Sequence, residues 1–167
     1  ERQRIREAIR KYGGDMTLLP LADEELDGAL GLVTMVEGVR RPTVAGLLIM
    51  GREETLRQHV PAHEVAFQVL ERTDVKVNEF FRKPLLQTFE EIEILFKARV
   101  NEQEIQVGLF RVSIPNYDRR ALREGLINAL VHRDYSRLGA VHVRLDDDGL
   151  TLSNPGGFVE GITFQNL

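Results

Sequence analysis

The sequence predicts an α+β fold, because segments with helical periodicity and segments with strand periodicity both occur, in an irregular order. The clearest helix covers residues 85–100, where apolar residues recur every three or four positions. The clearest strands cover residues 64–70 and 141–145, where apolar and polar residues alternate. These segments divide the chain into three stretches, residues 1–50, 51–112 and 113–167.

The composition is typical of a soluble, cytoplasmic globular protein. Of the 167 residues, 43% are hydrophobic and 29% are charged. No apolar run approaches the roughly 20 residues needed to span a bilayer, so we expect no membrane partner. The absence of cysteine excludes disulfides, thiolate zinc sites and a cysteine nucleophile. The net charge of -4 argues against this chain as the principal DNA-binding surface, because such surfaces neutralise phosphates with basic residues.

Both ends of the sequence predict a fragment of a longer protein. The first residue is Glu1 rather than methionine, and no signal peptide is visible. The last four residues, 164–167, carry no signal that would end a helix or a strand.

Residues 1–50 predict two helices and then a short hairpin. The first helix stops at Gly13, residues 21–32 form the second, and Gly38 lies in the turn of the hairpin. Residues 43–50 follow as an apolar strand or helix. The stretch as a whole is therefore helical at its start.

The order of helices and hairpin is similar to the outline of a winged helix. In that interpretation Arg40 and Arg41, near the tip of the hairpin, are candidate DNA contacts. A small α/β connector is the alternative, because two arginines at a turn are more often solvated than bound to DNA.

Residues 51–112 predict an α+β connector. Its helix covers residues 85–100, and its strands cover residues 64–70, 76–81 and 104–112.

Two histidines of this connector have a spacing that could be read as a metal site. His59 and His63 are four residues apart, but Pro61 between them interrupts a regular helix. A metal site would also need a third or fourth ligand. We therefore expect both histidines to be surface residues.

Residues 119–133 predict a largely buried helix that begins after its N-cap, Asp118. Glu124, Asn128 and His132 interrupt its apolar character. Because each step of four residues rotates only slightly around a helix, the three side chains form one polar stripe.

The polar stripe has two interpretations. A buried carboxylate and amide need partners, which nearby backbone, Arg133 or Tyr135 could supply. Alternatively, the stripe faces a ligand, and His132 is a further contact to it. In that case the amide oxygen of Asn128 suits Mg²⁺. The carboxylate of Glu124 could then orient or deprotonate a water that attacks a phosphate.

A hairpin and a glycine turn follow this helix. Residues 141–145 and 150–153 are its strands, and the acidic residues 146–148 at its tip are expected to be solvated rather than to bind a cation. Gly156 and Gly157 then form a turn that would let the backbone approach a ligand closely.

The motifs of this last stretch resemble the ATP-binding domain of the family of transcriptional regulators and RecG-related ATP-dependent helicases. They read Arg123-Glu124-Gly125-Leu126-Ile127-Asn128-Ala129-Leu130-Val131-His132-Arg133-Asp134-Tyr135, Leu152-Ser153-Asn154-Pro155-Gly156-Gly157 and Gly161-Ile162-Thr163. Residues 41–51 are similar to the connector that precedes this domain in the family. The resemblance therefore covers most of the chain, most strongly from residue 111 onward.

The resemblance implies a fold and ligands. The fold would be the GHKL (Bergerat-type) α/β sandwich of gyrase, Hsp90, MutL and sensor kinases, of which residues 113–167 are the front half. ATP and Mg²⁺ would be the ligands of the parent protein. DNA would be bound through other domains, and a second copy of the chain is an alternative partner.

The resemblance also implies roles for individual residues. Asn128 would hold the Mg²⁺ that bridges the phosphates, and Glu124 would be the general base. Asn154 would take the place of the aspartate that reads the adenine amino group. Gly156 and Gly157 would let the loop pass close to the base.

Two departures from the family pattern limit what this chain can do. Asn154 replaces the aspartate, which weakens or alters adenine recognition. The remaining glycine box and lid would lie beyond Leu167, so we expect this piece to bind ATP weakly or not at all and not to hydrolyse it. The family's N-terminal Schlafen AlbA-type domain and C-terminal winged helix are not clearly present. The sequence has no P-loop, which a RecG-type motor requires.

Four functions remain open from the sequence. The first is a transcriptional regulator in which nucleotide binding biases DNA-binding parts elsewhere in the protein. The second is a scaffold or oligomerisation module that has lost its ligand, and the third is direct DNA binding through residues 21–50. The fourth is ATP hydrolysis, confined to the intact protein.

Overall fold

The chain has a mixed α+β fold made of two compact units. The computed structural model describes residues 1–99, 102–107, 110–115 and 118–157. Unit 1 comprises residues 1–63 and 82–88, and unit 2 comprises residues 64–81 and those from 89 on. In the described part of the chain, no helix has the length and the apolar character to cross a membrane.

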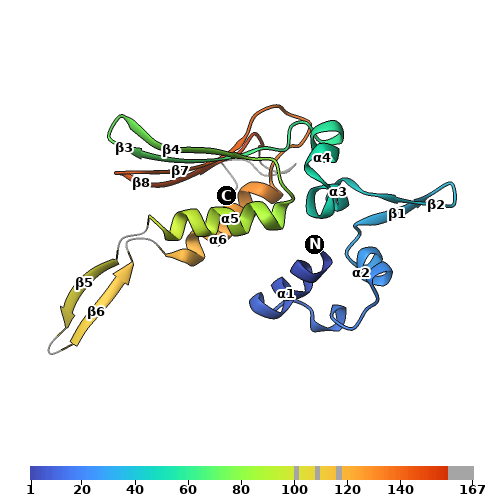
Figure 1. Ribbon diagram of the computed structural model, residues 1–167, viewed down its shortest axis with the longest axis horizontal. Helices are drawn as coiled ribbons and strands as arrows, with labels where there is room; N and C mark the ends of the chain where they lie inside the picture. Colours follow the sequence, from blue (N-terminus) through green and yellow to red (C-terminus); the bar gives the residue numbers. More distant parts are fainter. Residues whose placement is uncertain (100–101, 108–109, 116–117, 158–167) are drawn as a thin grey trace, which may run out of the picture. The chain divides into compact units, whose positions relative to one another are not determined.

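Unit 1 consists of short helices and one hairpin. Its elements are α1 (Arg2–Tyr12), the 3-10 helix η1 (Met16–Leu18), α2 (Asp23–Ala29), β1 (Val33–Val36), β2 (Val39–Pro42), α3 (Val44–Met50) and α4 (Glu53–His59) (Figure 1). The first helix ends as predicted, where Gly13 takes a left-handed conformation. The second is shorter than predicted, because the chain turns at Gly31, which has a φ of 64°. Residues 43–50 form a helix capped by Thr43, and α4 was not predicted.

A small apolar core and a buried carboxylate hold unit 1 together. Ile5, Leu26 and Leu32 form the core. Beside it, Asp27 is 3% exposed and accepts two hydrogen bonds from Arg2, at 2.9 and 2.8 Å. Arg40 approaches the same carboxylate at 3.5 Å and donates to the carbonyl of Glu24 at 2.6 Å. The arginine that the sequence offered as a DNA contact thus ties the hairpin to α2.

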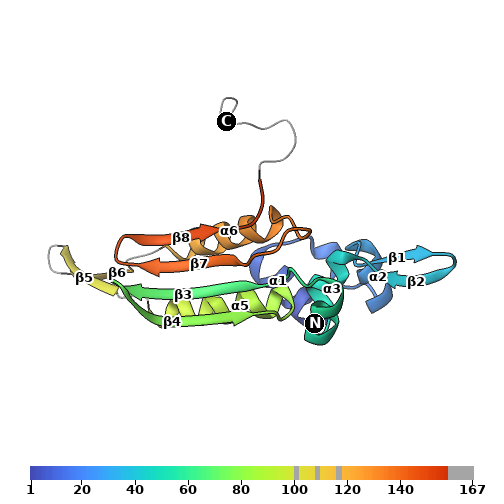
Figure 2. The ribbon, with the colours of Figure 1, turned by 90° about the horizontal axis from the view of Figure 1, so that it is seen from above.

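Unit 2 is a four-stranded mixed sheet with two helices on one face, and a separate hairpin (Figures 1 and 2). Its elements are β3 (Val65–Glu71), β4 (Asp74–Phe81), α5 (Leu85–Lys97, in this unit from Phe89), β5 (Glu102–Val107), β6 (Phe110–Pro115), α6 (Arg119–Val131), β7 (Val141–Asp146) and β8 (Gly149–Ser153). The sheet order is β4-β3-β7-β8, with β3 and β7 parallel and both outer pairs antiparallel. Strands from the second and third sequence stretches therefore share one sheet.

The core of unit 2 lies between the sheet and its two helices. Val65 and Phe67 on β3 and Val141 and Val143 on β7 are completely buried, and so is Ile92 on α5. These residues show the period-two and helical spacings that predicted the elements. The strands at 64–70 and 141–145 and the helix from residue 85 were thus predicted correctly.

The strand predicted over residues 104–112 is wrong. The structure forms two antiparallel strands there, β5 and β6, in which Val107 pairs with Phe110. Gly108 in the sequence is a common turn residue, and it offered the signal for a hairpin.

Candidate functional site

Helix α6 carries the predicted polar stripe, and its position is fixed by one cap and one apolar face. The carboxylate of Asp118 accepts a hydrogen bond from the backbone N–H of Arg120 at 2.7 Å, which confirms the predicted N-cap. Leu122 and Leu126 are buried on the face toward the sheet. Gly125 lies directly against the Leu152 side chain, which a Cβ at position 125 would overlap. The glycine therefore lets α6 approach β8 closely.

The polar stripe faces away from the core of unit 2. Glu124, Asn128 and His132 are all exposed. The predicted burial of most of this helix is wrong, because Ile127 and Val131 are 45% and 69% exposed. At their helical positions these two residues form a row beside the polar stripe. The outer surface of α6 thus combines an apolar row with a polar one.

The glycine turn lies at the C-terminal end of α6. The backbone N–H of Asp134 donates to the carbonyl of Pro155 at 3.1 Å. A Cβ on Gly156 would overlap the carbonyl oxygen of His132 and would lie 2.7 Å from Oδ1 of Asn154. Position 156 therefore requires glycine for packing. Gly157 is exposed, and a Cβ there would meet no atom of residues 1–157 that the structure describes within 4 Å.

These contacts bring part of the predicted site together. The backbone carbonyl of His132, whose side chain ends the stripe, lies against Gly156 of the turn that also contains Asn154. Asn128 and Glu124 lie one and two helical turns before His132, about 6 and 12 Å back along the axis. The stripe therefore leads away from the glycine turn along the exposed side of α6.

Arg133 and Tyr135, which the sequence offered as partners of the stripe, bond elsewhere. Arg133 is 5% exposed, and its Nη2 donates to the carbonyls of Gly139 and, at 3.5 Å, Arg137. The Tyr135 hydroxyl donates to the carbonyl of Leu130 at 3.2 Å, and the guanidinium of Arg133 lies 4.8 Å from the Tyr135 ring centre. Burial lowers the pKa of Arg133 and raises that of Tyr135.

The burial of Arg133 could have been found from the sequence. It continues the spacing of Leu122, Leu126 and Ala129 along the buried face of the helix. A charged residue in phase with an apolar face indicates either a buried partner or an end of the helix. Here it lies just beyond α6 and bonds to the loop that follows.

The other candidate ligands have local partners. Asp146 accepts from the backbone N–H groups of Asp148 and Gly149, both at 3.1 Å, and pairs with Arg144 at 3.0 Å. Asp147 accepts from the backbone N–H of Arg72 at 3.0 Å. Within the described ranges no group of three acidic or histidine side chains could hold a metal ion.

One of the two histidines predicted at the surface is buried. His59 is exposed at the end of α4, whereas His63 is 2% exposed. Nε2 of His63 lies 2.8 Å from the carbonyl oxygen of Lys83. The prediction failed for His63 because a long-range backbone contact, and not local sequence, decides its burial.

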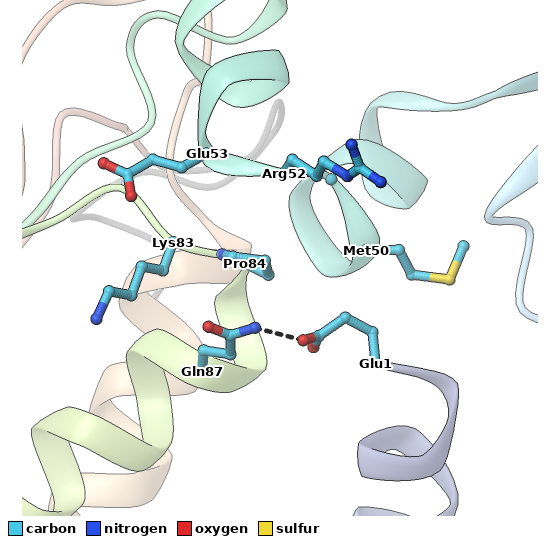
Figure 3. A pocket seen from close by; sticks show the side chains of 8 residues that line it. Glu1, Met50, Arg52, Glu53, Lys83, Pro84 and Gln87 are labelled. Carbon is cyan, nitrogen blue, oxygen red and sulfur yellow. Dashed lines mark hydrogen bonds between the residues drawn. The ribbon is translucent and has the colours of Figure 1, made fainter.

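A groove of about 320 Å³ lies in unit 1 (Figure 3). Glu1, Arg52, Glu53, Lys83 and Gln87 are among the residues that line it. Its charges are mixed, and Gln87 donates to the Glu1 carboxylate across it. None of the site residues predicted from the sequence contributes to this groove.

No family model and no curated protein matches this chain. Its fold is similar to that of the DIP2311 protein from Corynebacterium diphtheriae, known from a crystal structure, with a TM-score of 0.74 at 23% sequence identity. The match covers 97% of this chain but only 32% of that protein. The likeness shows a shared fold, and the chain spans about a third of the length of its structural neighbour.

Proposed function

We propose that α6 and the turn at residues 154–157 are the front half of a GHKL-like nucleotide site in a transcriptional regulator related to the RecG-like family. The observation that carries the proposal is the close approach of the backbone carbonyl of His132, the last residue of the polar stripe, to Gly156 of the turn. It joins two motifs that are about two dozen residues apart in the sequence. A ligand beside this contact would reach the stripe and the turn together.

Each exposed residue has a role in this proposal. The amide oxygen of Asn128 would bind Mg²⁺ on the phosphates, and Glu124, one turn further back, would activate a water in the intact protein. The apolar row of Ile127 and Val131 would meet the uncharged part of a ligand. Asn154 offers an amide N–H as well as a carbonyl oxygen, so both 6-amino and 6-oxo purines should be tried as ligands.

The test is the thermal stability of the full-length protein with Mg-ATP and with Mg-GTP. A ligand that binds only the folded state at 100 times its Kd adds about 2.7 kcal/mol to the free energy of unfolding. We expect a rise in melting temperature that Asn128→Ala abolishes. Asn78→Ala is the matched control, because Asn78 lies on β4 and bonds to Gln68 instead. A shift that persists in Asn128→Ala contradicts the proposal.

A scaffold or oligomerisation module is the second candidate, and the exposure of Ile127 and Val131 favours it. An apolar row on the outer side of a helix is a common interface feature. This candidate predicts no nucleotide effect in any variant. It also predicts that Val131→Asp lowers the mass of the particle in sedimentation.

A further inference from the structure

The loop between α6 and β7 is organised around the buried side chain of Arg133. Its guanidinium holds the carbonyls of Arg137 and Gly139 and lies over the ring of Tyr135. Asp134 braces the same loop, because its carboxylate accepts from the backbone N–H and the hydroxyl of Ser136, at 2.9 and 2.6 Å. The loop is therefore fixed at its start, its middle and its end.

This arrangement is not explained by stability alone. In the described part of the chain, Nε and Nη1 of Arg133 are buried without a hydrogen-bond partner. Burial of a charge with unpaired donors costs free energy, and apolar side chains of similar volume are often equally or more stabilising at such positions. The hydrogen bonds from Arg133 to the carbonyls of Arg137 and Gly139 suggest a different role, which is to hold the loop in place.

The loop that Arg133 holds lies next to the glycine turn. Asp134 donates to the carbonyl of Pro155 from one end of the loop. Gly139, at the other end, has a φ of 121°, and a Cβ on it would lie 3.6 Å from the Pro155 ring. The loop thus bonds to Pro155 at Asp134 and passes near the Pro155 ring at Gly139.

We propose that Arg133 is a positioning residue that holds residues 134–139 against Pro155 and thereby fixes the glycine turn of the candidate site. The part of this inference that concerns the ligand rests on the proposed nucleotide function. The part that concerns the loop does not, because it follows from contacts within unit 2.

Amide hydrogen exchange of the ligand-free full-length protein tests the loop directly. In Arg133→Met we expect the N–H groups of Asp134, Ser136 and Arg137 to exchange at least about tenfold faster, because their bonds open locally. The N–H groups that join β7 to β3 should keep their rates. Arg133→Lys retains the charge and should recover part of the protection. Arg137→Met is the comparison: the side chain of Arg137 is 68% exposed and pairs with Asp134 at 3.1 Å, so we expect a smaller increase than in Arg133→Met.

Unchanged exchange at Asp134 in both Arg133 variants overturns the proposal, and so does an equal increase throughout the sheet. If Arg133→Met does not fold, the exchange rates of Arg133→Lys at Asp134 and in the sheet test the proposal instead. Nucleotide affinity is measured on the same proteins, and we expect it to fall about tenfold in Arg133→Met. Selective loosening of the loop in a protein whose wild type binds no nucleotide supports the positioning role and refutes the proposed function.

Discussion

Among the residues that the structure describes, Asp27 of unit 1 and Arg133 of unit 2 are buried charged side chains, and they are held in opposite ways. In unit 1 the carboxylate of Asp27 is paired with Arg2 through two hydrogen bonds and approached by Arg40. In unit 2 the guanidinium of Arg133 donates hydrogen bonds to main-chain carbonyls, lies over the ring of Tyr135 and leaves two nitrogens without a hydrogen-bond partner among the described residues. Removing one partner of a buried pair is destabilising, because it leaves the other group uncompensated, whereas a buried charge with unpaired donors already costs stability and indicates a role in positioning.

The largest effect on stability is expected at Asp27. In Asp27→Ala the guanidinium of Arg2 loses both of its bonds to the carboxylate, and Arg40 loses one of its contacts with α2. We expect the free energy of unfolding of unit 1 to fall by about 2–3 kcal/mol, because hydrogen bonds to charged groups contribute strongly to stability. Hydrogen exchange at the Leu26 N–H, which is bonded within α2, measures this loss.

Asp23→Ala is the control for that measurement. Asp23 pairs with Arg6 at 2.8 Å, but its side chain is 57% exposed. Exposed pairs contribute at most about 1 kcal/mol. An equal loss in the two variants would show that burial does not distinguish the two carboxylates.

The second effect concerns the glycine turn of unit 2. In Gly156→Ala the added methyl group overlaps the carbonyl of His132, so the turn must move away from α6. We expect the free energy of unfolding to fall by roughly 1–3 kcal/mol, as it does when a side chain is enlarged at other tightly packed positions. Urea unfolding of the full-length protein provides the measurement.

Gly157→Ala is the neighbouring control. A Cβ at position 157 meets no atom of the described residues within 4 Å, so its effect on stability should stay within about 0.5 kcal/mol. If both substitutions are neutral, the contact between His132 and the turn is not tight, and the observation behind the proposed function is lost.

The sequence predicted those parts of the fold that local pattern decides. Alternation fixed the strands at 64–70 and 141–145, and the N-cap at Asp118 was read from its neighbours alone. Burial that depends on distant contacts was predicted wrongly, as His63 and Val131 show. His63 is buried next to a carbonyl 20 residues away, and Val131 is exposed although it is apolar.

The candidate site could be predicted in the same partial way. Spacing alone placed Glu124, Asn128 and His132 on one stripe, and the structure keeps them there. The contact of His132 with Gly156 depends on how a hairpin returns past the end of a helix. No spacing rule contains that information, because it is set by the pairing of β7 with β8 and by the loop that Arg133 holds.

The smallest effect is a dependence on pH that should separate the two buried charges. The hydrogen bonds from Arg2 hold the pKa of Asp27 below its ordinary value. The pKa of Asp27 is lower in the folded than in the unfolded chain. The stabilisation is therefore fully present above the ordinary pKa of an aspartate, which is about 4. It is lost as the pH falls through the folded pKa, because the unfolded chain then binds more protons.

Exchange at the Leu26 N–H should therefore differ between the wild type and Asp27→Asn by a constant factor from neutral pH down to about pH 5. Below that the factor should shrink, because a protonated Asp27 resembles asparagine. Arg133 remains charged throughout this range, but the nearby carboxylates of Asp134 and Glu64 act on it, so the comparison at the Asp134 N–H is made between neutral pH and about pH 5. In that interval we expect the ratio of exchange rates between Arg133→Met and the wild type to stay constant. A ratio that changes there would contradict the contrast between the two units.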